Sequence, residues 1–215
     1  MSTNTKNSKV FLLSPARTTG KRAQMVMRPQ ARFELALRLR TNGASIGELF
    51  RFMSGLYFRG KLAYAESFAV PPAGLAGAYV ITSCLGLVPV DRVLTLDNLR
   101  ALSDAAIHHE DAAYVSMLQR DARRLCEAMG GSCTAVLLGS IATAKYLAPL
   151  RDVFGERLLF PEPFIGRGDM SRGGLMLRAA QTGVELSYKP VGTGTHHGAR
   201  PPRLMRRGGR TTTSE

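Results

Sequence analysis

The sequence predicts a single α/β domain, a three-layer sandwich in which helices cover both faces of a small parallel sheet of about four strands. The chain has 215 residues, which suits one domain with a sizeable core. Short apolar runs end at a proline, a glycine or a small polar residue, and helical patterns fill the stretches between them. Strands that alternate with helices in this way form parallel sheets through right-handed crossovers. The four expected strands span residues 9–14, 78–83, 134–138 and 158–160.

The helices expected in the first third of the chain are marked by their ends. A helix over Pro29–Arg40 begins at a proline and ends before an Asn-Gly pair, both typical positions for these residues. Ser45 can cap a second helix because Glu48 stands three residues further on, which is the capping-box spacing. Gly55 ends that helix.

The later helices are predicted from apolar periodicity and from the glycines that interrupt it. One helical stretch is expected from about Thr95 to Met129, and another runs from Gly139 to Leu150. The glycine-rich segment Gly166–Gly174 is expected to be a loop that leads into a last helix at Leu175–Thr182.

Composition sets the limits of the domain. Residues 1–8 are polar, and residues 191–215 are rich in Gly, Pro, Thr and Arg, so both ends are expected to be disordered around a domain spanning 9–190. No apolar run is long enough to span a membrane, and the N-terminus does not resemble a signal peptide. We expect a cytoplasmic monomer. The three Cys and four His lack the spacing of a zinc site, so no metal or cofactor is expected.

Net positive charge is the strongest compositional feature. The chain carries 29 Lys and Arg against 16 Asp and Glu, a formal net charge of +13. Part of this excess lies in the C-terminal segment, and most of it lies in the expected domain. A protein with this excess is attracted to polyanions with a strong dependence on salt, which makes a nucleic acid the expected partner. The alternative is a generally basic protein without such a partner.

Five short motifs follow one another along residues 9–180: Leu12–Pro15, Gly55–Gly60, Ile81–Ser83 with Pro89–Arg92, Leu138–Ala142, and Phe160–Arg172. In this order they resemble the motifs of the uracil-DNA glycosylase superfamily, especially its small bacterial and archaeal branch. The resemblance implies a uracil-DNA glycosylase-like sandwich. It also implies an enzyme that flips a base out of double-stranded DNA and hydrolyses its N-glycosidic bond, which leaves an abasic site.

The resemblance also assigns the residues that would hold the base. Phe58 occupies the position of the family's stacking aromatic residue, and Tyr57 stands where the family has proline. Ser83 replaces the asparagine that recognises uracil. Ser14 and Arg17, at the end of the first strand, are candidates to contact the phosphate or the leaving base, and Ser14 is counted among the candidate catalytic residues.

Hydrolysis needs a group that stabilises positive charge on the sugar or orients water. Asp169 is the main candidate, and Glu162, fixed between two prolines, is a second. Met170 can act as an apolar wedge in the duplex. Further DNA contacts are expected from arginines in the motif segments, namely Arg59, Arg167 and Arg172. Lys61 and Lys21 lie near motifs, but nothing in the sequence indicates a depressed pKa, so a monofunctional enzyme without lyase activity is expected.

Departures from the family motifs bear on the substrate. The branch of the family whose motifs are most similar to these binds an iron–sulfur cluster through four cysteines. This chain has three cysteines and is therefore expected to lack the cluster. The first motif has no acidic residue or asparagine between Leu12 and Arg17, and the last motif has no histidine. These losses favour a larger, modified base, such as glucosylated hydroxymethylcytosine of phage DNA, and hence an antiviral role. The alternatives are an ordinary uracil-excision enzyme, a non-catalytic DNA-binding module, and an enzyme of nucleotide or modified-RNA metabolism.

Overall fold

The computed structural model describes residues 8–105, 107, 110–140 and 144–192, and it is an α/β fold in which helices flank a mixed sheet of six strands. The expected disordered segments 1–8 and 191–215 therefore lie almost wholly outside the described residues. The end of the Leu138–Ala142 motif also lies outside them. None of the helices in the described part of the chain is long and apolar enough to cross a membrane.

Four parallel strands form the centre of the sheet, which confirms the sequence prediction for this part of it. Their order in the sheet is β3-β1-β6-β7, and β1 pairs in parallel with both of its neighbours. The bounds of these strands are close to those expected from the apolar runs: β1 (Lys9–Leu13), β3 (Ala78–Ile81), β6 (Thr134–Leu138) and β7 (Leu158–Pro161).

The sheet is larger than predicted because two short antiparallel strands extend its edges. Strand β4 (Leu87–Pro89) pairs with β3, and β8 (Tyr188–Pro190) pairs with β7. Each has three residues and ends in proline, which cannot donate to a neighbouring strand and is therefore tolerated at a sheet edge. Neither segment has the length or the apolar run by which the central strands were predicted.

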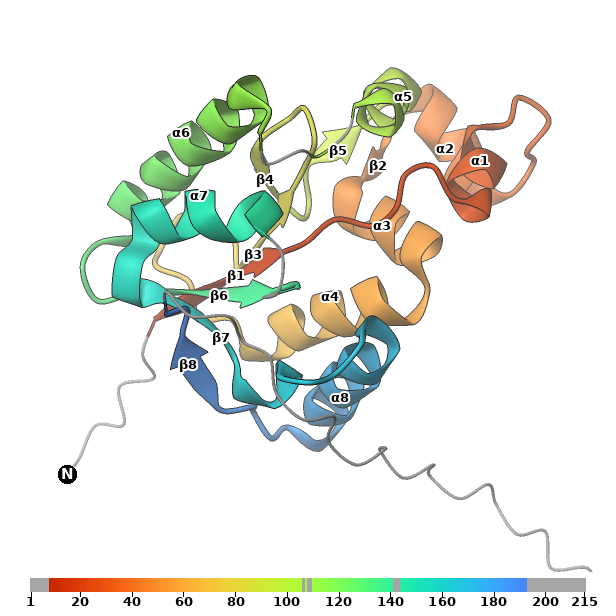
Figure 1. The fold of residues 1–215 in the computed structure, drawn as a ribbon. Coiled ribbons are helices and arrows are strands. Elements are labelled where there is room, and N and C mark those ends of the chain that lie inside the picture. The colour runs from red at the N-terminus through yellow and green to blue at the C-terminus, as the bar shows by residue number, and fades with distance from the viewer. Residues whose placement is uncertain (1–7, 106, 108–109, 141–143, 193–215) are drawn as a thin grey trace, which may run out of the picture.

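Two helical layers cover the sheet, as Figure 1 shows. Side chains of β1 alternate between them: Val10 and Leu12 pack with helices α6 (Ala112–Met129) and α7 (Ala144–Phe154), whereas Phe11 and Leu13 face the opposite layer. That layer contains α4 (Leu56–Phe68) and α8 (Asp169–Thr182). All four of these β1 side chains are fully buried, as expected for a strand covered on both faces.

A group of smaller elements lies beyond the carboxyl end of β1, at the right of Figure 1. They add buried apolar residues to the α4 side of the core and extend it past the sheet. The group consists of α1 (Lys21–Met27), α2 (Glu34–Thr41), β2 (Ala44–Ser45), α3 (Ile46–Ser54), β5 (Val93–Leu94) and α5 (Leu96–Asp104).

Helix ends show where local prediction succeeded and where it failed. The Ser45 hydroxyl accepts a hydrogen bond from the Glu48 N–H at 3.2 Å, which confirms the predicted cap of α3. The Glu48 carboxylate pairs with Arg38 instead of completing the capping box. The single helix expected from Thr95 to Met129 is two helices, because Asp111 caps a new one by accepting from the N–H groups of the first turn.

Candidate functional site

The order of the central strands creates a switch point next to β1. From β1 the chain crosses to β3 through the α4 side of the sheet, and from β6 it crosses to β7 through α7 on the other side. The loops that follow β1 and β6 therefore turn to opposite faces and leave a crevice at their carboxyl ends. Ligands of open α/β sheets bind in such crevices.

A pocket of about 500 Å³ lies at this position. We call it the edge pocket. It is lined by residues that follow β1 and β6 and by residues of α4, α7 and α8, together with Ser54 and Ile107. The residues that these strand ends and helices contribute are Ser14, Pro15, Ala16, Arg17, Tyr57, Ser140, Lys145, Tyr146, Asp169 and Met170.

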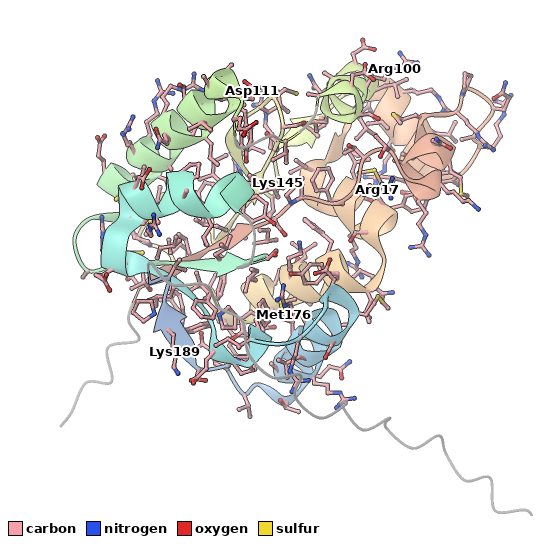
Figure 2. All side chains as sticks on the ribbon, viewed as in Figure 1. Arg17, Arg100, Asp111, Lys145, Met176 and Lys189 are labelled. Carbon is pink, nitrogen blue, oxygen red and sulfur yellow. The ribbon has the colours of Figure 1, made fainter. Side chains whose placement is uncertain are left out.

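A second pocket of about 400 Å³ adjoins the edge pocket. We call it the side pocket. The two share the loop residues Pro15–Arg17, together with Ile107 and Lys145. The side pocket extends over polar groups that include Ser83 and Asp104. Arg17 and Lys145, both labelled in Figure 2, thus stand where the two spaces meet.

The structure brings most of the predicted site residues together around these pockets. Ser14, Tyr57, Asp169 and Met170 line the edge pocket, although they come from three separate segments of the chain. Arg17 lines both pockets. Ser83 lines the side pocket, where its hydroxyl donates to the Leu102 carbonyl at 3.2 Å.

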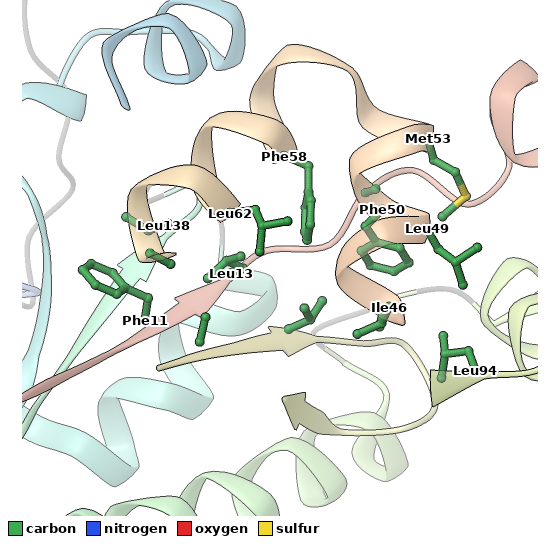
Figure 3. Close-up of a cluster of buried hydrophobic side chains, with 14 of the residues drawn as sticks. Phe11, Leu13, Ile46, Leu49, Phe50, Met53, Phe58, Leu62, Leu94 and Leu138 are labelled. Carbon is green, nitrogen blue, oxygen red and sulfur yellow. The ribbon is translucent and has the colours of Figure 1, made fainter. Parts of the chain in front are cut away.

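Phe58 is not available to stack on a base, so its predicted role is wrong. Its side chain is fully buried, with its ring centroid 5.4 Å from that of Phe50 in an edge-to-face arrangement. Figure 3 shows Phe58 and Phe50 among the core residues under α4. Successive residues of a helix point about 100° apart, so a helical α4 that buries Phe58 turns Tyr57 toward the pocket.

Arg172 is a buried anchor and not the phosphate clamp that the sequence suggested. Its side chain is 9% exposed, and its Nε and Nη2 atoms donate to the Phe164 carbonyl at 3.3 and 3.2 Å. Its Nη1 lies 3.9 Å from the Asp169 carboxylate. Arg172 therefore ties the loop before α8 to the helix and sets a positive charge behind Asp169.

Three other predicted residues do not line either pocket within the described part of the chain. Arg167 donates to the Pro163 carbonyl and to the Ser171 hydroxyl, which holds the loop before α8. Glu162 pairs with Lys189 of β8, so it acts at the sheet edge and not as a second acid of the site. Arg59 is exposed on the outer side of α4.

Arg59 instead helps to line a basic groove of about 590 Å³ on the outer surface. Arg22 and Arg51 line the same groove. Its apolar lining includes Met25, 45% exposed, and Phe52. The groove combines several guanidinium groups with one carboxylate, that of Glu48, so its net charge is positive.

Lys61 is a functional candidate that the sequence analysis named but set aside. It is 1% exposed, and its Nζ donates to the backbone oxygen of Ser14 at 2.6 Å and to the Ser14 hydroxyl at 2.8 Å. Burial lowers the pKa of this amine to about 7, whereas Asp169 opposes the shift and Arg172 adds to it. Nothing in the local sequence indicated this lowered pKa. Lys61 follows Phe58 by three residues and so lies on the same face of the helix, and this spacing could have indicated that its side chain is buried.

The Tyr57 hydroxyl is buried at the wall of the edge pocket. Its oxygen is buried, and it makes no hydrogen bond of good geometry with the described residues, although Arg172 lies close by. Burial raises the pKa of Tyr57 above its ordinary value, so the hydroxyl remains a proton donor. The hydroxyl is thus enclosed by protein beside Arg172, while the residue itself forms part of the wall of the edge pocket.

Two glycines let α4 and α8 touch beneath the edge pocket, and this contact explains why part of the predicted Gly166–Gly174 loop is helix. A Cβ atom on Gly173 would lie 2.9 Å from the Tyr57 Cα, and one on Gly60 would lie 2.6 Å from the Gly173 carbonyl oxygen. Helix α8 begins at Asp169, so Gly173 belongs to its packed face. The close approach holds Tyr57 and Lys61 of α4 against Asp169 and Arg172 of α8.

Gly173→Ala is expected to lower the free energy of unfolding by about 1–3 kcal/mol, because the added methyl group meets helix backbone that cannot move alone. Chemical denaturation monitored by circular dichroism measures this change. Gly131→Ala is the matched control, since a Cβ atom at Gly131 meets nothing within 4 Å. Equal stability of the two variants would contradict the close helix contact.

Neither the scan of family models nor the searches of curated proteins and of solved structures found a match for this chain. Among the described residues, no group of three or more His, Cys, Asp or Glu side chains is placed to hold a metal ion.

Proposed function

We propose that this protein is a DNA glycosylase that receives a flipped nucleotide in the edge pocket and hydrolyses its N-glycosidic bond. The observation that carries the proposal is the meeting of Ser14, Tyr57, Asp169 and Met170 around one pocket at the switch point of the sheet. The sequence motifs predict a role in that reaction for each of these residues. The residues come from distant parts of the chain.

The chemistry of the pocket supports this reaction class. Cleavage of an N-glycosidic bond places positive charge on the sugar and negative charge on the departing base. The Asp169 carboxylate, whose side chain is 65% exposed, can stabilise the sugar cation. Tyr57 lies at the pocket wall, where its ring can contact the base. Met170 is 67% exposed at the rim, where it can fill the space that the flipped base leaves.

The distribution of charge supports a DNA partner. Arg17 and Lys145 stand at the junction of the two pockets, where the phosphates flanking a flipped nucleotide would pass. The basic groove adds Arg22, Arg51 and Arg59 on the outer surface. Contacts of this kind position a duplex without reading its sequence.

The side pocket supports an enlarged base as the substrate. A base seated against Tyr57 in the edge pocket can extend a substituent past Arg17 into a space of about 400 Å³. Three residues with oxygen-bearing side chains, Ser83, Ser103 and Asp104, line that space. Such groups are suited to a hydroxylated substituent such as a sugar, so we propose a glucosylated hydroxymethylcytosine of phage DNA as the target and antiviral defence as the role.

A cleavage assay tests the proposal. The protein is incubated with plain, uracil-containing and glucosylated hydroxymethylcytosine DNA, and the products are heated in alkali, which breaks strands at abasic sites. Breaks in the glucosylated DNA alone are expected. Breaks in uracil DNA would indicate an ordinary repair enzyme instead. Binding without breaks in any DNA would contradict the glycosylase and favour a non-catalytic binding module.

A further inference from the structure

The burial of Lys61 calls for an explanation that the proposed function does not supply. Lysine is almost never fully buried without a paired charge, because the ammonium group loses its hydration. At 1% exposure, Lys61 finds its hydrogen-bond acceptors among the described residues in two atoms of Ser14, and neither of them is charged. The rings of Tyr57 and Phe58 enclose the rest of the amine, with centroids 4.2 and 5.2 Å from Nζ.

The surroundings of Lys61 make its neutral form accessible near neutral pH. The charged groups that act on it come from α8: Asp169 favours the ammonium form, and Arg172 opposes it. Tyr57 of α4 and Tyr146 of α7, on the other walls of the pocket, are phenols. Since desolvation outweighs the effect of Asp169 and brings the pKa to about 7, the neutral amine predominates above that pH.

Ser14 connects this amine to the edge pocket. Its hydroxyl lies 2.8 Å from Nζ, and the residue lines the pocket that also contains Asp169. Its position is fixed because its N–H and its hydroxyl both donate to the Leu138 carbonyl, at 3.2 and 3.5 Å. Gly139 also packs against it so closely that a Cβ atom there would lie 3.0 Å from the Ser14 Cβ. A serine held in this way can pass a proton between the pocket and a buried base.

We propose that Ser14 and Lys61 form a proton relay that activates the attacking water, a role that rests on the proposed glycosylase function. As the water oxygen bonds to the sugar C1′, the bond from C1′ to the base breaks and the base leaves with the electron pair. The water proton moves to the Ser14 oxygen, and the Ser14 proton moves to the Lys61 nitrogen. The ammonium group then returns its proton through Ser14 to the departed base. Asp169 stabilises the sugar cation, and Lys61 acts only through Ser14.

Two measurements test the relay. The first is an NMR titration of the Lys61 side chain in the substrate-free protein, where a midpoint near pH 7 is expected. The second is the single-turnover rate of base release on the DNA that the wild type cleaves. Because the neutral amine is the active form, the rate should rise tenfold per pH unit below about pH 7 and become constant above it.

Ser14→Ala and Lys61→Met separate the relay from a structural role. At pH 8 each is expected to lower the rate about 100-fold and to abolish the inflection near pH 7, and the double variant should be no slower than either single variant. Ser14→Ala keeps the backbone acceptor of Lys61, so it remains informative if Lys61→Met folds poorly. Lys189→Met, on an exposed lysine of β8, is the control and should keep the wild-type profile.

The outcomes distinguish the relay from the function on which it rests. A Lys61 midpoint above pH 9, or an inflection that persists in Ser14→Ala, would overturn the relay and leave the glycosylase intact. No base release from any DNA by the wild-type protein would overturn the function instead. The NMR midpoint does not depend on substrate, so it would then still decide whether the buried amine is neutral near pH 7.

Discussion

Phe58→Ala is expected to lower the free energy of unfolding by about 3–5 kcal/mol, the usual cost of removing a fully buried phenylalanine ring. The ring packs edge-to-face on Phe50 in the centre of the α4 side of the core, and the cavity left behind cannot collapse without moving the helix. Denaturant titration of the purified variant measures the loss. Any fall in DNA cleavage should follow the fraction of unfolded protein.

Phe33→Ala provides the control for this prediction. Phe33 is 36% exposed and stacks on Phe52 at 5.3 Å, so its truncation removes a similar ring from a much less enclosed place. A loss of about 1 kcal/mol or less is expected. If Phe58→Ala were as stable as Phe33→Ala but bound DNA poorly, the assignment of Phe58 to the core would be wrong and a stacking role would return.

Asp169→Asn is expected to lower the rate of base release by about 10²–10³-fold, because the amide keeps the shape of the side chain but removes the charge that faces the sugar cation. DNA affinity should be unchanged or slightly higher, since one negative charge is lost from a basic surface. Single-turnover cleavage gives the rate, and fluorescence anisotropy with the same DNA gives the affinity.

Asp97→Asn is a matched control for the charge change. Asp97 also lies in the first turn of a helix and pairs with an arginine three residues further on, at 3.0 Å. It lies outside both pockets as described, so its loss should change stability by a few tenths of a kcal/mol and leave the rate unchanged. Equal rates for Asp169→Asn and Asp97→Asn would remove Asp169 from the chemistry.

The central sheet could be predicted because its strands bury both faces. Residues Lys9–Leu13 and Thr134–Leu138 are almost continuous apolar runs, which parallel strands between two helical layers require. Among the described residues, the edge strand Leu87–Pro89 pairs on one side only, and neither its length nor its composition distinguishes it from a loop. Strands that are buried on both faces could therefore be predicted from their apolar runs, whereas the partly exposed edge strands could not.

The sequence allowed us to predict which segments form the site, but not which way their side chains point. Ser14 was found because it follows the first apolar strand, and Asp169 was found because it lies in the polar, glycine-rich segment Gly166–Gly174. Tyr57 and Phe58 are adjacent in sequence, and only the rotation of α4, which its packing on the sheet determines, decides which ring reaches the pocket. The burial of Lys61 and Arg172 depends on α8 approaching α4, a contact between distant segments that local patterns do not contain.

The backbone contact at Gly60 and Gly173 also limits how this protein can adapt. Because the two helix backbones touch at Gly60 and Gly173, no larger residue fits at either position without forcing the helices apart. Selection for a new substrate must therefore act on exposed wall residues such as Lys145 and Met170. Directed evolution of base preference should draw its beneficial substitutions from those positions and leave both glycines untouched.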